Sequence, residues 1–408
     1  MLRTLIIATF LALPGSVAAQ DSATERLDDP ESQDLEITDQ SAETGGFKLF
    51  QHGIWPHAEA SGNISLQPLA TAIPKPVSKQ RKPKPVSLKT AVPRRTDLPS
   101  IRAAERRHRL PYGLLDALIW AESRYNPVAL SHAGAGRGVI NAGRPDLDLR
   151  DAGSLRRAID RNSPDVVINA AGFTRVDAAE SEAAEAEYLN VDGPRALALA
   201  CRRVGIPFIH MSTDCVFDGT LSRPYRPDDT ANPLSTYGRT KLRGEQAVAA
   251  AHERHLIVRV SWVFSQYADN FVRTMLRLAQ TRDEVTVVSD QIGFPTYAPA
   301  LAGGLLAMAD AVCSDAFSDW GTYHLAARAE TDRASMARHI FAVSARHAGP
   351  GARVEGVLTA NYPTPAQRPL NSRLDSSRTS DVFGIELEHW QIGLAHTIPI
   401  LLNELGTA

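Results

Sequence analysis

The chain has 408 residues, of which 43% are hydrophobic and 22% are charged. This length predicts roughly two or three domains, and three cysteines are too few for a small scaffold held together by disulfides. The 44 lysines and arginines nearly cancel the 46 aspartates and glutamates. Net charge therefore gives no reason to expect a nucleic-acid partner or a membrane-surface protein driven by bulk electrostatics.

The start of the chain is typical of a secretory signal peptide. Arg3 precedes an apolar run over residues 5–13, and the small residues 17–19 (VAA) form a cleavage site. A membrane anchor is the alternative, but the apolar run is too short to span a bilayer of about 30 Å. We predict a signal peptide over residues 1–19, export to the periplasm and no stable membrane insertion.

Residues 20–97 are polar, first acidic and then basic and rich in proline. Such a composition cannot bury enough apolar surface to offset the entropy lost on folding, so we predict a disordered linker with extended proline-rich stretches. A basic arm that touches anionic wall polymers or lipid is the functional alternative to a solvated spacer.

Residues 98–138 contain a helical pattern. Apolar residues recur at helical spacing over 114–119, Pro111 suits a first turn, and Glu122 stands at the end of the helix. With the motif ESRYNP at 122–127, the segment resembles the opening of a lytic transglycosylase domain. The resemblance implies that Glu122 is the general acid/base of peptidoglycan cleavage, a role suited to a carboxyl group beside an apolar wall.

The remainder of that domain does not follow. After Gly136 the sequence continues as RGVIN (137–141) rather than into the family's sugar cleft. A glutamate without a cleft cannot position a substrate, so the alternative is that Glu122 only ends a packed helix in a truncated domain. The glycines of 134–138 follow no apolar strand, which argues against a phosphate-binding loop there.

From residue 139 the pattern alternates between apolar strands and amphipathic helices. Strands separated by single helices predict an α/β fold with a Rossmann-like, doubly wound parallel sheet, in which ligands bind beyond the carboxyl ends of the strands. The predicted strands are 139–142, 165–169, 208–212, 256–260 and 284–288, and the predicted helices include 154–161, 194–203, 241–252 and 268–280.

Two segments in this part predict reductase chemistry. One strand end carries MSTDCVFDG (211–219), and STYGRTK (235–241) opens a later helix, on which Tyr237 and Lys241 share one face. A nearby ammonium favours the phenolate of a tyrosine. We predict that Tyr237 donates a proton to a carbonyl oxygen while a hydride reaches its carbon, that Lys241 tunes Tyr237, and that the Thr213 hydroxyl holds the oxygen. A surface tyrosine–lysine pair is the alternative.

With these residues, segment 139–408 resembles the dTDP-4-dehydrorhamnose reductases, which are extended short-chain dehydrogenase/reductases. The resemblance implies reduction of dTDP-4-dehydro-6-deoxy-L-mannose to dTDP-L-rhamnose with NADPH or NADH, and a small substrate domain beside the sheet. The matching motifs are DVVINAAG (165–172), STD (212–214), Tyr237 with Lys241, SWVF (261–264), DQIGFPT (290–296) and RPLNSRLD (368–375).

The resemblance also implies roles for single residues. Thr213, Tyr237 and Lys241 would be catalytic, and Asp214 and Trp262 would contact the sugar-nucleotide substrate. The positions expected along the cofactor are Asp148, Leu149, Gly172, Phe173, Thr174, Met211, Tyr237 and Lys241.

The opening unit of the reductase family is not found before residue 139. That unit is a strand followed by a glycine-rich turn whose N–H groups hold the cofactor pyrophosphate. We therefore predict a sheet without its first strand and helix, produced by fusion of the start of one gene to the truncated body of another. We expect the activity to be impaired for the same reason.

The sequence gives conflicting indications of the cellular location of the protein. The reductase part belongs in the cytoplasm, whereas a signal peptide directs export. Arg144 would favour NADPH if it met a 2′-phosphate, the alternative being a solvated loop charge. The resemblance implies a homodimer and use of Mg²⁺, for which no ligand cluster gives independent support. Three functions stay open: a nucleotide-sugar reductase, active or decayed; an exported peptidoglycan lyase fragment; and a non-enzymatic wall-associated protein.

Overall fold

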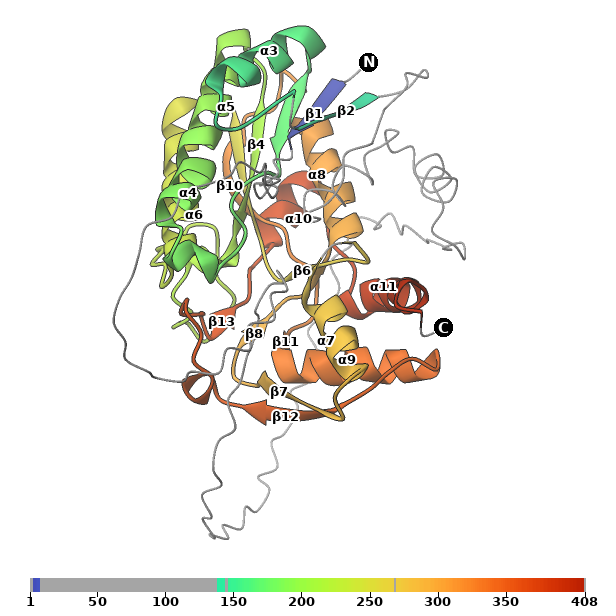
Figure 1. Cartoon of the computed structure of the whole chain (residues 1–408). Helices are drawn as coiled ribbons and strands as arrows, with labels where there is room; N and C mark the ends of the chain where they lie inside the picture. The colour runs from blue at the N-terminus through green and yellow to red at the C-terminus, as the bar shows by residue number, and fades with distance from the viewer. Residues whose placement is uncertain (1–2, 8–137, 144–145, 268, 407–408) are drawn as a thin grey trace, which may run out of the picture. The chain divides into compact units, whose positions relative to one another are not determined.

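Six parallel strands form the main sheet, in the order β10-β5-β4-β3-β1-β2 (Figure 1). The computed structural model describes residues 3–7, 138–143, 146–267 and 269–406. The strand order reverses between β1 and β3, which is the position where doubly wound sheets bind ligands. The six strands are β1 (Arg3–Ile7), β2 (Gly138–Ala142), β3 (Val166–Asn169), β4 (Phe208–Thr213), β5 (His255–Val260) and β10 (Gly321–His324). The predicted α/β class and parallel sheet are confirmed.

Helices cover both faces of this sheet. Figure 1 shows α3, α4, α5 and α6 on one face and α8 and α10 on the other. Val166 and Ile168 of β3 pack into one core cluster and Val167 into the other, because successive side chains of a strand point to opposite faces. The helices are α3 (Ala152–Asn162), α4 (Ala183–Glu187), α5 (Gly193–Val204), α6 (Thr236–Ala251), α8 (Ala298–Val312) and α10 (Ser377–Phe383).

The remaining strands form three short sheets outside the main sheet (Figure 1). Their strands are β11 (Thr331–Asp332), β8 (Ile292–Gly293) and β13 (Asn371–Ser372) in one sheet, β12 (Arg353–Val357) and β7 (Glu284–Val288) in the second, and β6 (Val263–Phe264) and β9 (Thr296–Tyr297) in the third. The remaining helical segments are α7 (Phe271–Ala279), α9 (Arg333–Arg346), α11 (Trp390–Glu404), the π-helical turn η2 (Tyr188–Asp192), and the 3-10 turns η1 (Ala178–Glu180), η3 (Asp214–Val216) and η4 (Thr359–Asn361).

The predicted loss of the first strand is wrong. Residues Arg3–Ile7 form β1, which pairs in parallel with β2 on one side and with β3 on the other. The sequence RTLII is rich in β-branched residues, and a short apolar run of this kind suits a buried strand as well as the core of a signal peptide. The strand that precedes β2 in the usual order of this fold lies at the start of the chain, about 130 residues before β2, rather than directly before residue 139.

The other predictions for the first part of the chain fall almost entirely outside the described residues. These are the rest of the signal peptide, the linker 20–97, the absent helix after the first strand, and segment 98–137 with Glu122. They stay predictions. In the described part of the chain, no helix is both long and apolar enough to cross a bilayer.

Two element predictions need correction in the reductase part. The predicted strand 284–288 forms β7, but β7 pairs with β12 rather than joining the main sheet. The sixth strand of the main sheet is instead β10, whose sequence GTYH is too short and polar for hydrophobic periodicity to reveal. The helix predicted over 241–252 begins at Thr236, because the Ser235 side chain accepts a hydrogen bond from the Gly238 N–H and caps the helix there.

Candidate active site

The predicted catalytic residues lie where the carboxyl end of β4 meets the start of α6. Thr213 is the last residue of β4, and Tyr237 is the second residue of α6. Gly238 is what allows this close approach: a Cβ there would lie 2.2 Å from the Cys215 carbonyl oxygen. Because that oxygen belongs to the backbone, it cannot move aside easily. The glycine therefore holds the start of α6 against the loop that follows Thr213.

Lys241 is anchored to the same strand. Its Nζ donates a hydrogen bond to the Met211 carbonyl oxygen at 2.7 Å, and its side chain is buried. Burial lowers the pKa of Lys241 to about 8 from the ordinary 10.5, while the negative charge of Glu245 acts in the opposite direction. The amine can therefore gain or lose its proton near neutral pH, at a position one helical turn from Tyr237.

Glu245 was not predicted, and it supports Lys241 from the next turn of α6. The Arg259 guanidinium donates from Nε at 2.9 Å and from Nη2 at 2.7 Å to the two Glu245 carboxylate oxygens. The Ser212 hydroxyl also donates to this carboxylate, and all three side chains are buried. The spacing of Tyr237, Lys241 and Glu245, each four residues apart on one helix face, is the signal that could have identified it.

Thr213 and Asp214 form a buried hydroxyl–carboxyl pair. The Thr213 Oγ1 donates to Asp214 Oδ1 at 2.8 Å and accepts from the Cys215 N–H at 3.1 Å. The Ser261 hydroxyl donates to the other Asp214 oxygen at 3.1 Å. Burial raises the pKa of Asp214, although these hydroxyl groups and the positive charge of Arg333 oppose the rise. A carboxyl group in this position can bind a hydroxyl of a substrate as donor or as acceptor.

Trp262, the predicted substrate contact, has a strained backbone. Its φ of +46° lies in the left-handed region, which a bulky residue seldom adopts. The indole ring packs so closely on Gly293 that a Cβ there would lie 2.5 Å from it. Arg333, which was not predicted, places its guanidinium carbon 3.5 Å from the centroid of the same ring. Trp262 is thus fixed between β8 and the start of α9.

The residues predicted for the nicotinamide side lie after β3. Gly172 is so close to its neighbours that a Cβ would lie 2.7 Å from Asn190 Oδ1 and 3.9 Å from Lys241 Nζ. Asn190, which was not predicted, accepts from the Phe173 N–H at 2.8 Å and donates to the Phe173 carbonyl oxygen at 3.2 Å. Phe173 is buried and Thr174 is exposed. The side chain of Asn190 thus shapes the turn beside Lys241.

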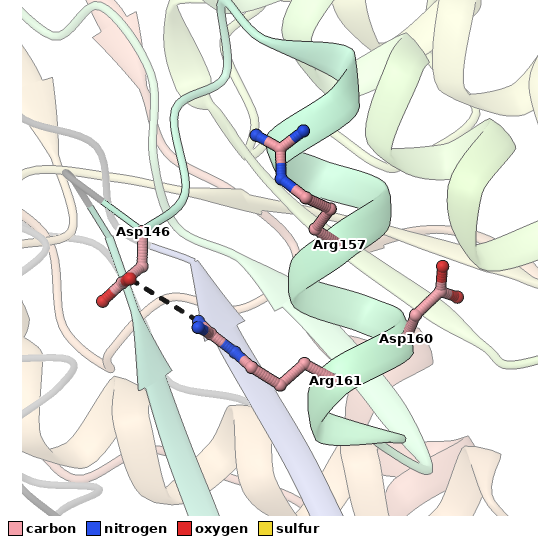
Figure 2. Close-up of a pocket in the computed structure, with 4 residues that line it drawn as sticks. All are labelled: Asp146, Arg157, Asp160 and Arg161. Carbon is pink, nitrogen blue, oxygen red and sulfur yellow. Dashed lines mark ion pairs between the residues drawn. The ribbon is translucent and has the colours of Figure 1, made fainter.

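The residues predicted for the adenine side lie in the loop before α3. The Asp148 carboxylate accepts from the Arg150 N–H at 3.0 Å, and Leu149 is buried against Gly193. Arg144 lies outside the described residues. Figure 2 shows a separate surface hollow on this side of the sheet, lined by the exposed, mixed-sign side chains Asp146, Arg157, Asp160 and Arg161.

That hollow does not contain the predicted chemistry. Asp146 and Arg161 form an ion pair of 3.7 Å across it (Figure 2). Arg157 pairs with Asp151 at 3.0 Å. None of the predicted catalytic residues lines it. Exposed pairs of this kind stabilise a protein little. Among the described residues, no group of three His, Cys, Asp or Glu side chains is arranged to hold a metal ion, so Mg²⁺ stays a prediction.

Comparison with known proteins identifies the family. Residues 127–402 match the family described as the RmlD substrate binding domain. The chain belongs to this family. The match begins inside segment 98–138, before the change of sequence pattern at residue 139.

RmlD relatives cover most of the same region. A dTDP-4-dehydrorhamnose reductase from Sinorhizobium fredii is 42% identical over 267 residues, which cover 65% of this chain and 90% of the relative. The protein of the same name from Escherichia coli K12 is 42% identical over 247 residues, covering 60% and 81% of the two chains.

Solved structures of RmlD-like proteins agree with the fold. The dTDP-4-dehydrorhamnose reductase from Clostridium acetobutylicum is 33% identical, with a TM-score of 0.60 and coverage of 66% of this chain and 92% of that chain. The one from Bacillus anthracis, solved in complex with NADP, is 29% identical, with a TM-score of 0.60 and coverage of 65% and 90%.

Proposed function

We propose that this chain reduces dTDP-4-dehydro-6-deoxy-L-mannose to dTDP-L-rhamnose with NADPH or NADH. The observation that carries the proposal is the placement of Tyr237 and Lys241 on α6 against the Thr213–Asp214 end of β4. The names of the RmlD relatives support the substrate, and the NADP in the Bacillus anthracis structure supports the cofactor.

Tyr237 and Lys241 would have different roles in carbonyl reduction. The nicotinamide would supply the hydride to the sugar carbonyl carbon. Tyr237 would donate its hydroxyl proton to the carbonyl oxygen, and protonated Lys241 would stabilise the phenolate that remains. Because the Met211 carbonyl holds Nζ at 2.7 Å, the ammonium is already in place before the substrate binds. Loss of the proton from Tyr237 then needs no rearrangement of the lysine.

Thr213 would have a second hydrogen-bonding partner in the complex. In the structure its hydroxyl proton points to Asp214. To donate to the substrate oxygen, the hydroxyl must rotate, and Asp214 must find another donor. A hydroxyl on the sugar ring next to the carbonyl can supply it. Asp214 would in this way orient the sugar while Thr213 turns to the reacting oxygen.

The residues present fit the nicotinamide end of a dinucleotide. At Gly172 the Asn190 amide occupies the space that a side chain would need, so the turn after β3 lies close to Lys241, beside which the nicotinamide would bind. At the pyrophosphate end, the sequence after β1 contains no glycine before Gly15. We propose that this weakens cofactor binding while the chemistry at Tyr237 is retained.

The proposed reaction is tested by following NADPH consumption on addition of the 4-dehydro sugar nucleotide. Tyr237→Phe is expected to reduce kcat by roughly 100- to 10,000-fold, because the proton donor is lost while the ring and its packing remain. Tyr188→Phe, a matched change at an exposed tyrosine, is expected to leave kcat unchanged. Wild-type protein that binds NADPH but never consumes it would refute the proposal.

The location and assembly of the reductase belong to the same proposal. We place the folded reductase in the cytoplasm, where its cofactor and substrate would be found, and this choice is supported by the use of Arg3–Ile7 as β1. The homodimer stays a prediction. Peptidoglycan cleavage through Glu122 is not carried forward, since that residue lies outside the described part of the chain.

A further inference from the structure

We infer that Arg333 binds the diphosphate of the sugar nucleotide and uses the Trp262 ring as its platform. The guanidinium carbon lies 3.5 Å from the Trp262 ring centroid and 5.3 Å from that of Phe271. Stacking on these two rings fixes the plane of the guanidinium but uses none of its N–H donors. The inference rests on the proposed function for the identity of the ligand.

The donors of Arg333 are unused within the described part of the chain. No hydrogen bond or ion pair joins its guanidinium to another described residue, although the side chain is half-buried. Two other arginines show the contrast: Arg368 binds Asp177 through two bonds of 2.9 and 2.7 Å, and Arg259 binds Glu245 through two. A partly desolvated cation with free donors is a ready partner for an anion.

The charges around Arg333 favour an anionic ligand. Burial lowers the pKa of Arg333 to about 10, and the positive charge of Arg368 acts in the same direction, while Asp214 opposes it. Arg368 already has a carboxylate partner in Asp177, whereas Arg333 forms no ion pair with a described residue. A phosphate or diphosphate would supply the missing negative charge.

The position of Arg333 distinguishes the diphosphate from other anions. Thr213 marks the place of the reacting carbonyl, and the neighbouring Asp214 is close enough to Arg333 for their charges to interact. Arg333 directly follows β11, and Trp262 contacts Gly293 of β8, so both lie beside the β11–β8–β13 sheet. In a 4-dehydro sugar nucleotide the carbonyl carbon and the carbon that bears the diphosphate are at opposite ends of the sugar ring. A ring that places its carbonyl at Thr213 and passes Asp214 therefore presents its diphosphate toward Arg333.

The inference is tested by calorimetric binding of dTDP and of thymidine, which lacks the diphosphate, to the full-length protein. In Arg333→Gln the Kd for dTDP is expected to rise at least tenfold, while thymidine binding is unchanged, because a hydrogen-bonded ion pair is lost only for the charged ligand. The Kd of Arg333→Lys for dTDP is expected to lie between those of the wild type and Arg333→Gln. Arg338→Gln removes the same charge from an exposed position on α9 and should leave dTDP binding as in the wild type.

Each outcome decides the inference separately from the reaction. Wild-type affinity for dTDP in Arg333→Gln, or equal affinity of the wild type for dTDP and thymidine, would overturn it, as would a failure of the wild type to bind dTDP. If the wild type binds dTDP through Arg333 but consumes no NADPH with the 4-dehydro sugar nucleotide, the proposed function fails and the inference stands. Thermal melting of each variant separates lost binding from lost fold.

Discussion

Lys241 donates a hydrogen bond to the Met211 carbonyl oxygen at 2.7 Å, which ties the central helix of the site to the strand that ends in Thr213. The bond places the ammonium without help from a ligand. It also leaves the Lys241 side chain buried, with Glu245 as the nearby negative charge that favours its protonated form. The protonation of Lys241 therefore depends on groups that lie behind the site.

This arrangement predicts a loss of activity at alkaline pH. The chemistry needs protonated Lys241, and its pKa is about 8, so kcat/KM is expected to fall as the pH rises through that value. The effect on stability has the opposite sign. Between pH 8 and the ordinary 10.5 the unfolded chain holds more protons than the folded one, so this residue makes the free energy of unfolding increase with pH there. A pH–rate profile measures the fall in kcat/KM, and melting curves at several pH values measure the change in stability.

Glu245→Gln is expected to move the alkaline limb of the pH–rate profile to lower pH, because the carboxylate that raises the pKa of Lys241 is removed. The change also leaves Arg259 buried without its partner and should destabilise the fold by about 3 to 5 kcal/mol. Arg259→Lys is the control, since it weakens the same paired geometry but keeps both charges. An equal shift of the limb in both variants would contradict the role given to the Glu245 charge.

A further prediction concerns the glycine that lets α6 approach β4. In Gly238→Ala the added methyl group would meet the Cys215 carbonyl oxygen at 2.2 Å, so the helix start must move. A displacement of Tyr237 by about 1 Å is enough to reduce kcat roughly 100-fold, and the strain should lower the free energy of unfolding by about 1 to 3 kcal/mol.

Gly303→Ala is the matched control for Gly238→Ala. Gly303 also lies inside a helix, but a Cβ there would meet nothing within 4 Å. Alanine should therefore leave kcat unchanged and stabilise α8 by about 0.5 to 1 kcal/mol through its better helix propensity. Initial rates and thermal melting of both variants test the pair. Equal kcat values in the two variants would show that the clash at Gly238 is relieved without moving Tyr237.

The sequence predicts the central strands and the catalytic residues of the reductase part because both leave local signals. Apolar runs separated by helical patterns mark β3, β4 and β5, and a tyrosine and a lysine four residues apart mark one face of α6. Arg333 leaves no such signal. It stands in the segment TDRAS (331–335), and only its contact with the Trp262 ring in the folded chain shows what it can do.

The first strand shows a different limit of sequence interpretation. The residues of β1 are separated from those of β2 by about 130 positions, and the pairing of two strands so far apart is a tertiary choice that local patterns do not record. The same short apolar run fits an export signal, whose recognition depends on flanking residues, and a buried strand, which depends on its neighbours.

The pairing of β1 predicts that deletion of residues 1–19 destabilises the fold. Ile6 lies in register with Asn141 of β2 and with Ile168 of β3, so the strand supplies backbone hydrogen-bonding groups to both sides. A chain that starts at residue 20 would leave these groups unpaired in the sheet interior, each at a cost of about 1 to 3 kcal/mol. We expect this chain to melt at a lower temperature than the full-length protein, or to be insoluble.

Ile6→Pro tests the same strand without shortening the chain. Proline lacks the N–H that a central strand needs, so this variant should be destabilised, whereas Ile6→Val keeps the N–H and should melt close to the wild type. Fractionation of cells that produce the tagged full-length chain adds the second measurement: because β1 belongs to the main sheet, NADPH-binding protein should retain its first residues and be found in the cytoplasm. A chain cleaved after residue 19 that melts like the full-length protein would show that the sheet is stable without β1, and the segment would then be free to serve as a signal peptide alone.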